Sequence, residues 1–181
     1  MPPAEAFEDH FPYSEVAAKG SRASALLLRI LSTASRVLLE RARELAVGNG
    51  SERQIAVIFT QIACDLHTER MIDGLIGLRG LERYRDALMA ATRRPRSLAD
   101  KGTRKLYESL TDGDCPAGDS DKRIPPVAWW ADWKRTRDLR DDVAHKGVDV
   151  TTAQVGQAIA LAGEYLNHLD RVAAACATAG K

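Results

Sequence analysis

Residues 151–177 read TTAQVGQAIALAGEYLNHLDRVAAACA, with apolar side chains at every third or fourth position. The apolar positions are Val155, Ala158, Ile159, Ala162, Tyr165, Leu166, Leu169, Val172, Ala173 and Cys176. This period matches the 3.6-residue turn of an α-helix and predicts a long helix with one buried face. Thr151 or Thr152 is its expected N-cap. Such a helix must bury its stripe against other elements of the fold.

The rest of the chain supplies partners with the same pattern. Long amphipathic helices are predicted over residues 21–46, 52–78 and 126–145, and shorter ones over 81–92 and near 102–110. No stretch shows the sustained strict alternation that is typical of a half-buried strand. The sequence therefore predicts an all-α protein, an antiparallel bundle of four long helices with short helices between them.

The organisation along the chain follows from proline, glycine and charge. Residues 1–20 contain three prolines and are expected to form an irregular N-terminal arm, and residues 21–177 a single helical domain. Residues 93–125 are basic and then polar, which predicts an insertion between core helices. Residues 178–181 are expected to be a short tail. Pro125 and Pro126 are expected to open the third long helix.

Composition limits the class of protein. The 181 residues are 45% hydrophobic and 28% charged, and 26 basic residues nearly balance 25 acidic ones, so nucleic-acid binding would need a local patch. Three widely spaced cysteines, without a CxxC pair, argue against disulfides or a zinc knuckle. The N-terminal residues lack the features of a signal peptide, and no apolar run is long enough to span a membrane. A cytoplasmic protein is expected.

The run Arg140-Asp141-Asp142-Val143-Ala144-His145 has the clearest chemical content, and it lies just before Gly147, a predicted helix stop. An Arg followed by a His four to six residues later, at the end of a third core helix, resembles the HEPN superfamily. Residues 61–65, QIACD, also resemble the second-helix pattern of that family, in which a small residue precedes an acid. The resemblance covers residues 21–177 in helix order, and residues 140–147 are its specific part.

The resemblance implies a metal-independent endoribonuclease that needs no cofactor, of a kind often found as a toxin or defence enzyme. Arg140 and His145 would be the catalytic pair, with Asp141 as a supporting polar residue and Asp65 able to reach the motif from the second helix. The expected RNA contacts are Arg137 and Lys146. An arginine can clamp phosphate oxygens with two donors, and a histidine titrates near neutral pH as acid or base.

The spacing of the motif has a geometric consequence. Arg140 and His145 are five residues apart, so on a continuous helix they point about 140° away from each other. Asp141 and His145 are four apart and share a face, which would allow a hydrogen bond to the imidazole. One Arg and one His supply an acid or a base but not both. We therefore expect either a helix that ends before His145 or a homodimer with a composite site.

Two other interpretations of the motif remain open. The chain can be a non-catalytic HEPN module that binds RNA or a nucleotide, working with a cognate antitoxin or a nucleotidyltransferase-like protein. The run can also be a plain charged helix end, in which His145 and Lys146 complement the helix dipole.

Four further features have a structural and a functional interpretation. Trp129, Trp130 and Trp133 have the spacing of core residues, although they could stack on bases. The basic cluster over residues 93–105 is either a solvated loop or a phosphate contact. Asp65, His67 and Glu69 alternate in direction on a helix, which disfavours a shared metal. His10 and His168 are expected on the surface.

Overall fold

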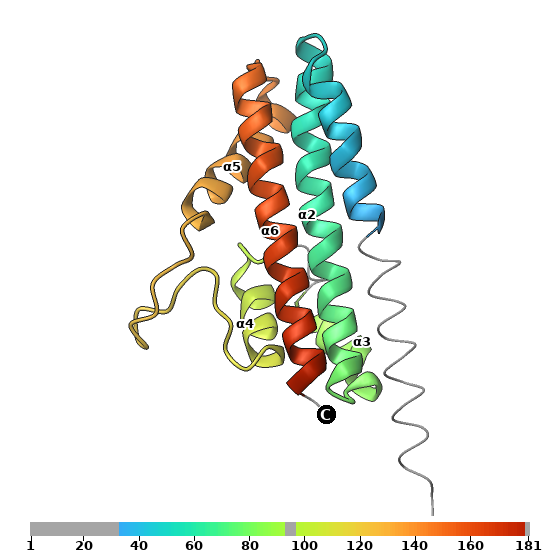
Figure 1. The fold of residues 1–181 in the computed structure, drawn as a ribbon, viewed down its shortest axis with the longest axis vertical. Helices are drawn as coiled ribbons and strands as arrows, with labels where there is room; N and C mark the ends of the chain where they lie inside the picture. Colours follow the sequence, from blue (N-terminus) through green and yellow to red (C-terminus); the bar gives the residue numbers. More distant parts are fainter. Residues whose placement is uncertain (1–32, 93–96, 180–181) are drawn as a thin grey trace, which may run out of the picture.

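The computed structural model describes residues 33–92 and 97–179, and these fold as a packed bundle of helices (Figure 1). The long helices are residues 33–46, α2 (Gly50–Leu78), α5 (Trp130–Lys146) and α6 (Thr152–Ala179). The shorter ones are η1 (Glu82–Tyr84), α3 (Arg85–Ala91) and α4 (Lys101–Leu110). The prediction of an all-α helical bundle is confirmed. None of the helices in the described ranges is both long and apolar enough to cross a membrane.

Helices α2 and α6 lie side by side and form the centre of the bundle (Figure 1). At one end the Arg53 Nε donates a hydrogen bond to the Val150 carbonyl at 2.7 Å. Farther along both helices, the hydroxyl groups of Thr68 and Tyr165 are hydrogen-bonded to each other at 2.5 Å. Residue numbers therefore rise in the same direction along both helices, so this central pair is parallel. Residues 33–46 and α5 run the opposite way, which makes each long helix antiparallel to the next one along the chain.

The start of α2 is fixed by Asn49. Its side-chain oxygen accepts a hydrogen bond from the Glu52 amide at 3.1 Å, and the Glu52 carboxylate accepts one from the Asn49 amide at 2.7 Å. This reciprocal capping box satisfies two backbone donors that a helix end otherwise leaves unpaired.

Replacing Asn49 with alanine is expected to lower the free energy of unfolding by about 1 kcal/mol, because the Glu52 amide loses its acceptor. Urea denaturation followed by circular dichroism measures the change. Ser51→Ala, an exposed position in the same helical turn, is the control and is expected to cost less than about 0.5 kcal/mol. Equal losses in the two variants would contradict the capping role.

The aromatic side chains of α5 anchor it on the central pair. Trp133 is 1% exposed and stacks on Tyr165 with ring centroids 4.5 Å apart and an interplanar angle of 14°. Trp130 is also buried and lies against Trp133, whereas Trp129 is only partly buried. Trp130 and Trp133 are therefore core residues, as their spacing predicts.

Helix α5 begins and ends later than predicted. It starts at Trp130 rather than at residue 126, because the Val127 amide donates to the Pro116 carbonyl at 3.0 Å and holds the preceding segment against the loop. It continues through His145 to Lys146. Gly147 then takes the left-handed conformation, with φ of 64°, and its amide donates to the Val143 carbonyl. The alternative of a helix that ends before His145 is wrong.

Helix α6 is capped by Thr151, whose hydroxyl oxygen accepts a hydrogen bond from the backbone amide of Gln154 at 3.2 Å. It continues to Ala179, so the predicted tail is wrong for residues 178 and 179. The predicted arm, the first part of the first helix, residues 93–96 of the basic cluster and residues 180–181 lie outside the described residues.

The predicted insertion contains α4, near the position expected for its short helix, and then a long loop to residue 129 (Figure 1). The loop is tied across its tip, where Asp119 and Ile124 exchange two backbone hydrogen bonds of 2.8 Å. Gly118, with φ of 73°, passes so close to the following chain that an added Cβ would lie 2.6 Å from the Pro126 nitrogen. The loop therefore has a defined path at this point.

Candidate functional site

A pocket of about 350 Å³ lies between α2, α5 and the segment that leads into α4. The side chains that give it chemical character are Gln61, Ile62, Asp65, Asp100, Arg137 and Arg140. Three of them, Asp65, Arg137 and Arg140, are residues to which the sequence assigned a role. They meet because one face of α2 packs against the face of α5 that carries both arginines.

Asp65 is the acid at the inner side of this pocket. Its Oδ1 accepts a hydrogen bond from the Gln61 amide nitrogen at 2.7 Å. Burial raises the pKa of this carboxyl to about 6, against the lowering effects of the Gln61 hydrogen bond and of the Arg140 and Arg137 charges. A carboxyl with such a pKa can release or accept a proton close to neutral pH.

The raised pKa predicts that Asp65 weakens the fold when it is ionised. The folded state binds the proton more tightly than the unfolded chain, so stability falls between about pH 4 and pH 6 and stays lower above that window. Asp65→Asn is therefore expected to raise the free energy of unfolding at pH 7.5 by about 1–3 kcal/mol and to flatten its change across the window. Urea denaturation at pH 4.5 and 7.5 measures both effects.

The exposed Asp86→Asn serves as the matched control for this substitution and is expected to change stability by less than about 0.5 kcal/mol at either pH. A destabilised Asp65→Asn variant at pH 7.5 would show that the ionised carboxylate contributes to the fold instead.

Each arginine of the pocket is held by one carboxylate. Arg140 Nη1 lies 3.0 Å from Asp141 Oδ1, and Arg137 Nη2 donates to Asp100 Oδ1 at 3.3 Å. The Nε of each arginine is buried without a hydrogen-bond partner in the described part of the chain. Each guanidinium has five N–H donors, so both retain donors for a further oxygen ligand. Asp141 supports Arg140 in this arrangement, not the imidazole of His145.

His145 and Lys146 lie outside the pocket, on the exposed last turn of α5. Because α5 is continuous between Arg140 and His145, the two side chains leave the helix on different sides. His145 makes no hydrogen bond or ion pair with any residue that the structure describes. Lys146 lies 2.7 Å from the Asp142 carboxylate, and this contact raises the pKa of its ammonium group.

The sequence assigns no role to three polar residues of the pocket, which are Gln61, Ser97 and Asp100. Gln61 stands four residues before Asp65, a spacing that places both side chains on one face of a helix and could have indicated the contact. Asp100 lies 37 residues before Arg137, and no sequence pattern joins them. Their pairing depends on how the segment before α4 folds back on α5.

The histidines of the central helices are structural. His67 is 5% exposed, with Nε2 2.9 Å from Asp170, and therefore does not face Asp65 or Glu69. The expectation that His168 is a surface residue is wrong, since its side chain is 12% exposed and its Nε2 lies 2.8 Å from Asp114. His10 lies outside the described residues. Among residues 33–92 and 97–179, no three His, Cys, Asp or Glu side chains are grouped so that they could hold a metal ion.

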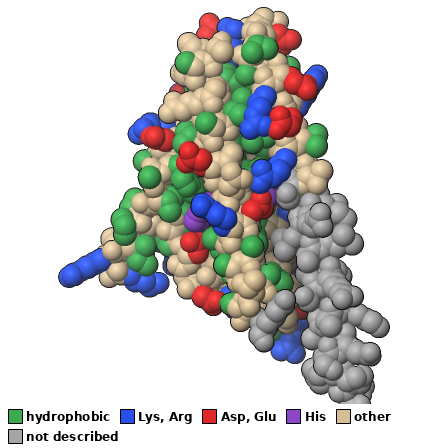
Figure 2. Space-filling view, in the orientation of Figure 1, with side chains coloured by type: hydrophobic (Ala, Val, Ile, Leu, Met, Phe, Trp, Pro, Cys, Tyr) green, Lys and Arg blue, Asp and Glu red, His purple; other side chains and the backbone are tan. Residues whose placement is uncertain are grey.

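Basic and acidic side chains alternate over the face shown in Figure 2, without a broad region of one sign. This distribution agrees with the net charge of +1. No protein-family model, curated protein or solved structure matches this chain.

Proposed function

We propose that the chain is a metal-independent endoribonuclease of the HEPN type, a toxin or defence enzyme that acts in the cytoplasm. The observation that carries this proposal is the meeting of Arg140, Arg137 and Asp65 in one pocket. Two guanidinium groups beside a carboxyl with a pKa of about 6 combine phosphate binding with proton transfer.

RNA cleavage of this kind needs few groups. The 2′-oxygen attacks phosphorus and loses its proton to a base, while the bond to the 5′-oxygen breaks and that oxygen takes a proton from an acid. The products carry a 2′,3′-cyclic phosphate and a 5′-hydroxyl. Arg140 and Arg137 would stabilise the charge on the phosphoryl oxygens, and His145 with Asp65 would exchange the two protons. Lys146 would contact a neighbouring phosphate.

A homodimer with two-fold symmetry completes this site. His145 leaves α5 on a different side from Arg140, so a His145 from a second copy must reach the pocket. The surface beside the pocket fits such a contact, because Ile55 and Ile62 on α2 are 41% and 44% exposed and lie two turns apart on one side of the helix.

The composite site predicts a specific result when two inactive variants are mixed. An Arg140→Ala subunit and a His145→Ala subunit form a heterodimer in which one site has both side chains. A 1:1 mixture that has exchanged subunits should recover about one quarter of the wild-type activity, because half of the dimers are mixed and each has one intact site. Recovery is measured as cleavage of an end-labelled RNA.

The control is each variant alone after the same exchange procedure, which should stay inactive. A mixture that stays inactive although native mass spectrometry detects the heterodimer would place Arg140 and His145 in the same subunit, contrary to the composite site.

The activity itself is tested by incubating the purified chain with single-stranded and transfer RNA in EDTA. Cleavage to cyclic-phosphate ends supports the proposal, and no cleavage of either RNA at high protein concentration overturns it.

The second candidate is a non-catalytic module that binds RNA, a nucleotide or a protein partner such as an antitoxin or a nucleotidyltransferase-like protein. It is favoured by the carboxylates that already occupy Arg140 and Arg137 and by the position of His145 outside the pocket. RNA binding without cleavage, in the same assay, would support this candidate.

A further inference from the structure

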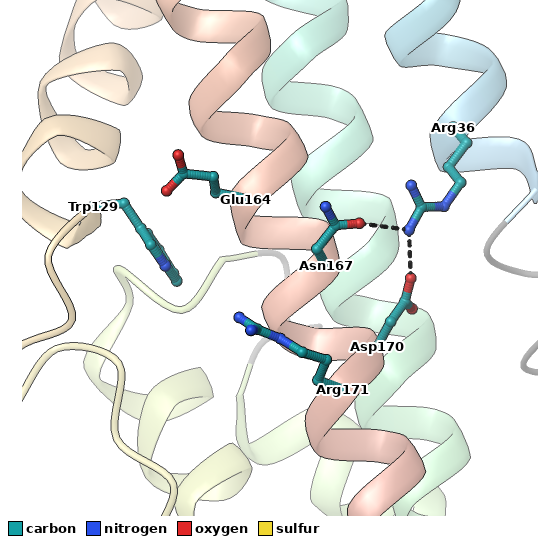
Figure 3. A pocket seen from close by; sticks show the side chains of 6 residues that line it. All are labelled: Arg36, Trp129, Glu164, Asn167, Asp170 and Arg171. Atoms are coloured by element: carbon teal, nitrogen blue, oxygen red, sulfur yellow. Dashed lines mark hydrogen bonds and ion pairs between the residues drawn. The ribbon is translucent and has the colours of Figure 1, made fainter.

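A second and larger hollow, of about 610 Å³, lies on another part of the surface, between Trp129, one face of α6 and Arg36 (Figure 3). Its volume falls within the range of roughly 300–1,000 Å³ that is typical of small-molecule sites. The remaining side chains that line it are Glu164, Asn167, Asp170 and Arg171. None of these residues belongs to the Arg140 pocket.

Trp129 is the aromatic side chain that lines this hollow. Its neighbours Trp130, Tyr165 and His168 meet it at interplanar angles of 54°, 74° and 68°, so none of the three is parallel to it. Trp133, by contrast, is stacked flat on Tyr165. Trp129 is partly buried, and no aromatic ring of the described residues stacks flat on it. A planar ligand could therefore stack there.

The charged side chains of the hollow divide into a pair and two that have no protein partner among the described residues. Arg36 donates to Asn167 at 3.0 Å and to Asp170 at 2.7 Å, as the dashed lines in Figure 3 mark. Asp170 also lies against the buried His67. Although burial raises the pKa of Asp170, its contacts with His67 and Arg36 hold that pKa below its usual value. Arg36 and Asp170 thus neutralise each other.

Glu164 and Arg171 are the unpaired charges, and both are exposed. Neither makes a hydrogen bond or ion pair with any residue that the structure describes. Both extend from α6 toward Trp129, Glu164 near one end of its ring and Arg171 beyond the other end (Figure 3). They are seven residues apart, which on a helix corresponds to about 10 Å. The hollow therefore presents an acceptor, an aromatic surface and a cation in a row.

We propose that this hollow binds one nucleotide, with its base stacked on Trp129, its hydroxyl groups donating to Glu164 and its phosphate accepting from Arg171. The order of the row fits this ligand class. In a nucleotide the ribose hydroxyls and the 5′-phosphate lie on different sides of the sugar, and the base projects from the sugar between them. The nucleotide can be a free monophosphate or one unit of an RNA strand.

This proposal is independent of the ribonuclease proposal, because it uses none of the same residues. It is tested by isothermal titration of the full chain with adenosine 5′-monophosphate, adenosine, inorganic phosphate and a single-stranded oligoadenylate. The monophosphate is expected to bind with a Kd in the micromolar to millimolar range. Arg171→Gln should weaken that binding about tenfold and leave adenosine binding unchanged.

Trp129→Leu should weaken the binding of both adenosine and the monophosphate by roughly 5- to 100-fold. Because Trp129 also packs on Tyr165 and His168, the exposed Arg171 variant provides the independent test if the Trp129 variant does not fold. Arg83→Gln on the distant, exposed η1 is the matched arginine control and should bind normally.

Binding of the oligoadenylate alone, sensitive to Arg171→Gln, would identify an RNA strand as the source of the nucleotide. The proposal is overturned if neither the monophosphate nor the oligoadenylate binds, or if inorganic phosphate binds as tightly as the monophosphate. It is also overturned if binding of the monophosphate is lost in Arg140→Ala but kept in Arg171→Gln.

Discussion

Arg140→Ala is expected to reduce RNA cleavage by about 100- to 1,000-fold while leaving the protein folded. The side chain is 28% exposed and lies at the edge of the pocket, so its removal leaves little buried space empty. What is lost is a planar group that can donate two parallel hydrogen bonds to a phosphate as negative charge develops on it. Cleavage rates in EDTA and thermal melting, measured on the same preparation, separate the two effects.

Arg140→Lys keeps the charge without the planar fork and is expected to fall between the wild type and the alanine variant. The Arg140 charge also lowers the pKa of Asp65, so any residual activity of Arg140→Ala should have its pH dependence displaced toward higher pH. Arg83→Ala, an exposed arginine on η1, is the control and should cleave normally. If Arg140→Ala retains more than about half of the wild-type rate, the assigned site is wrong.

The largest effect on stability is expected at Trp133. Trp133→Ala should lower the free energy of unfolding by about 3–5 kcal/mol, because it removes a fully buried ring and leaves a cavity beside Tyr165. This is a large part of the roughly 5–15 kcal/mol that stabilises a domain. The melting temperature should fall by roughly 6–20 °C in a chain of this length. Thermal and urea denaturation measure both quantities.

Trp133→Phe keeps an aromatic ring against Tyr165 and should lose less than half as much. Lys134→Ala changes the next residue, which is exposed, and should lie within about 0.5 kcal/mol of the wild type. A loss below about 1 kcal/mol for Trp133→Ala would mean that the stack on Tyr165 does not hold α5 on the central pair.

The helical periodicity predicts α2 and α6 well, because the stripe of each helix is a local property of its own sequence. It contains no information on direction, so the parallel packing of these two helices could not be predicted. His168 shows a different limit. It lies between Tyr165 and Leu169 on the buried stripe, but its polar neighbours suggested a surface position, and its partner Asp114 is 54 residues away.

Only part of the candidate site could be predicted from the sequence. The motif identifies Arg140 by a short spacing within one helix, whereas the proximity of Asp65 on the second helix is implied only by the family resemblance. Asp100 and the exact start of α5 depend on contacts between distant segments, such as the hydrogen bond from Val127 to Pro116. The length of α5 excludes a helix that ends before His145, and a composite site in a homodimer stays a prediction.

The bridge between Asp119 and Ile124 also determines where the chain can be altered with least effect. The two residues hold the ends of the loop tip together, so extra residues placed between Lys122 and Arg123 would lengthen the tip without moving the helices on either side. Lys122 and Arg123 are exposed, and the tip extends away from the bundle (Figure 1). The tip is thus a natural position for an affinity tag, a fluorescent reporter or new termini in a circular permutant.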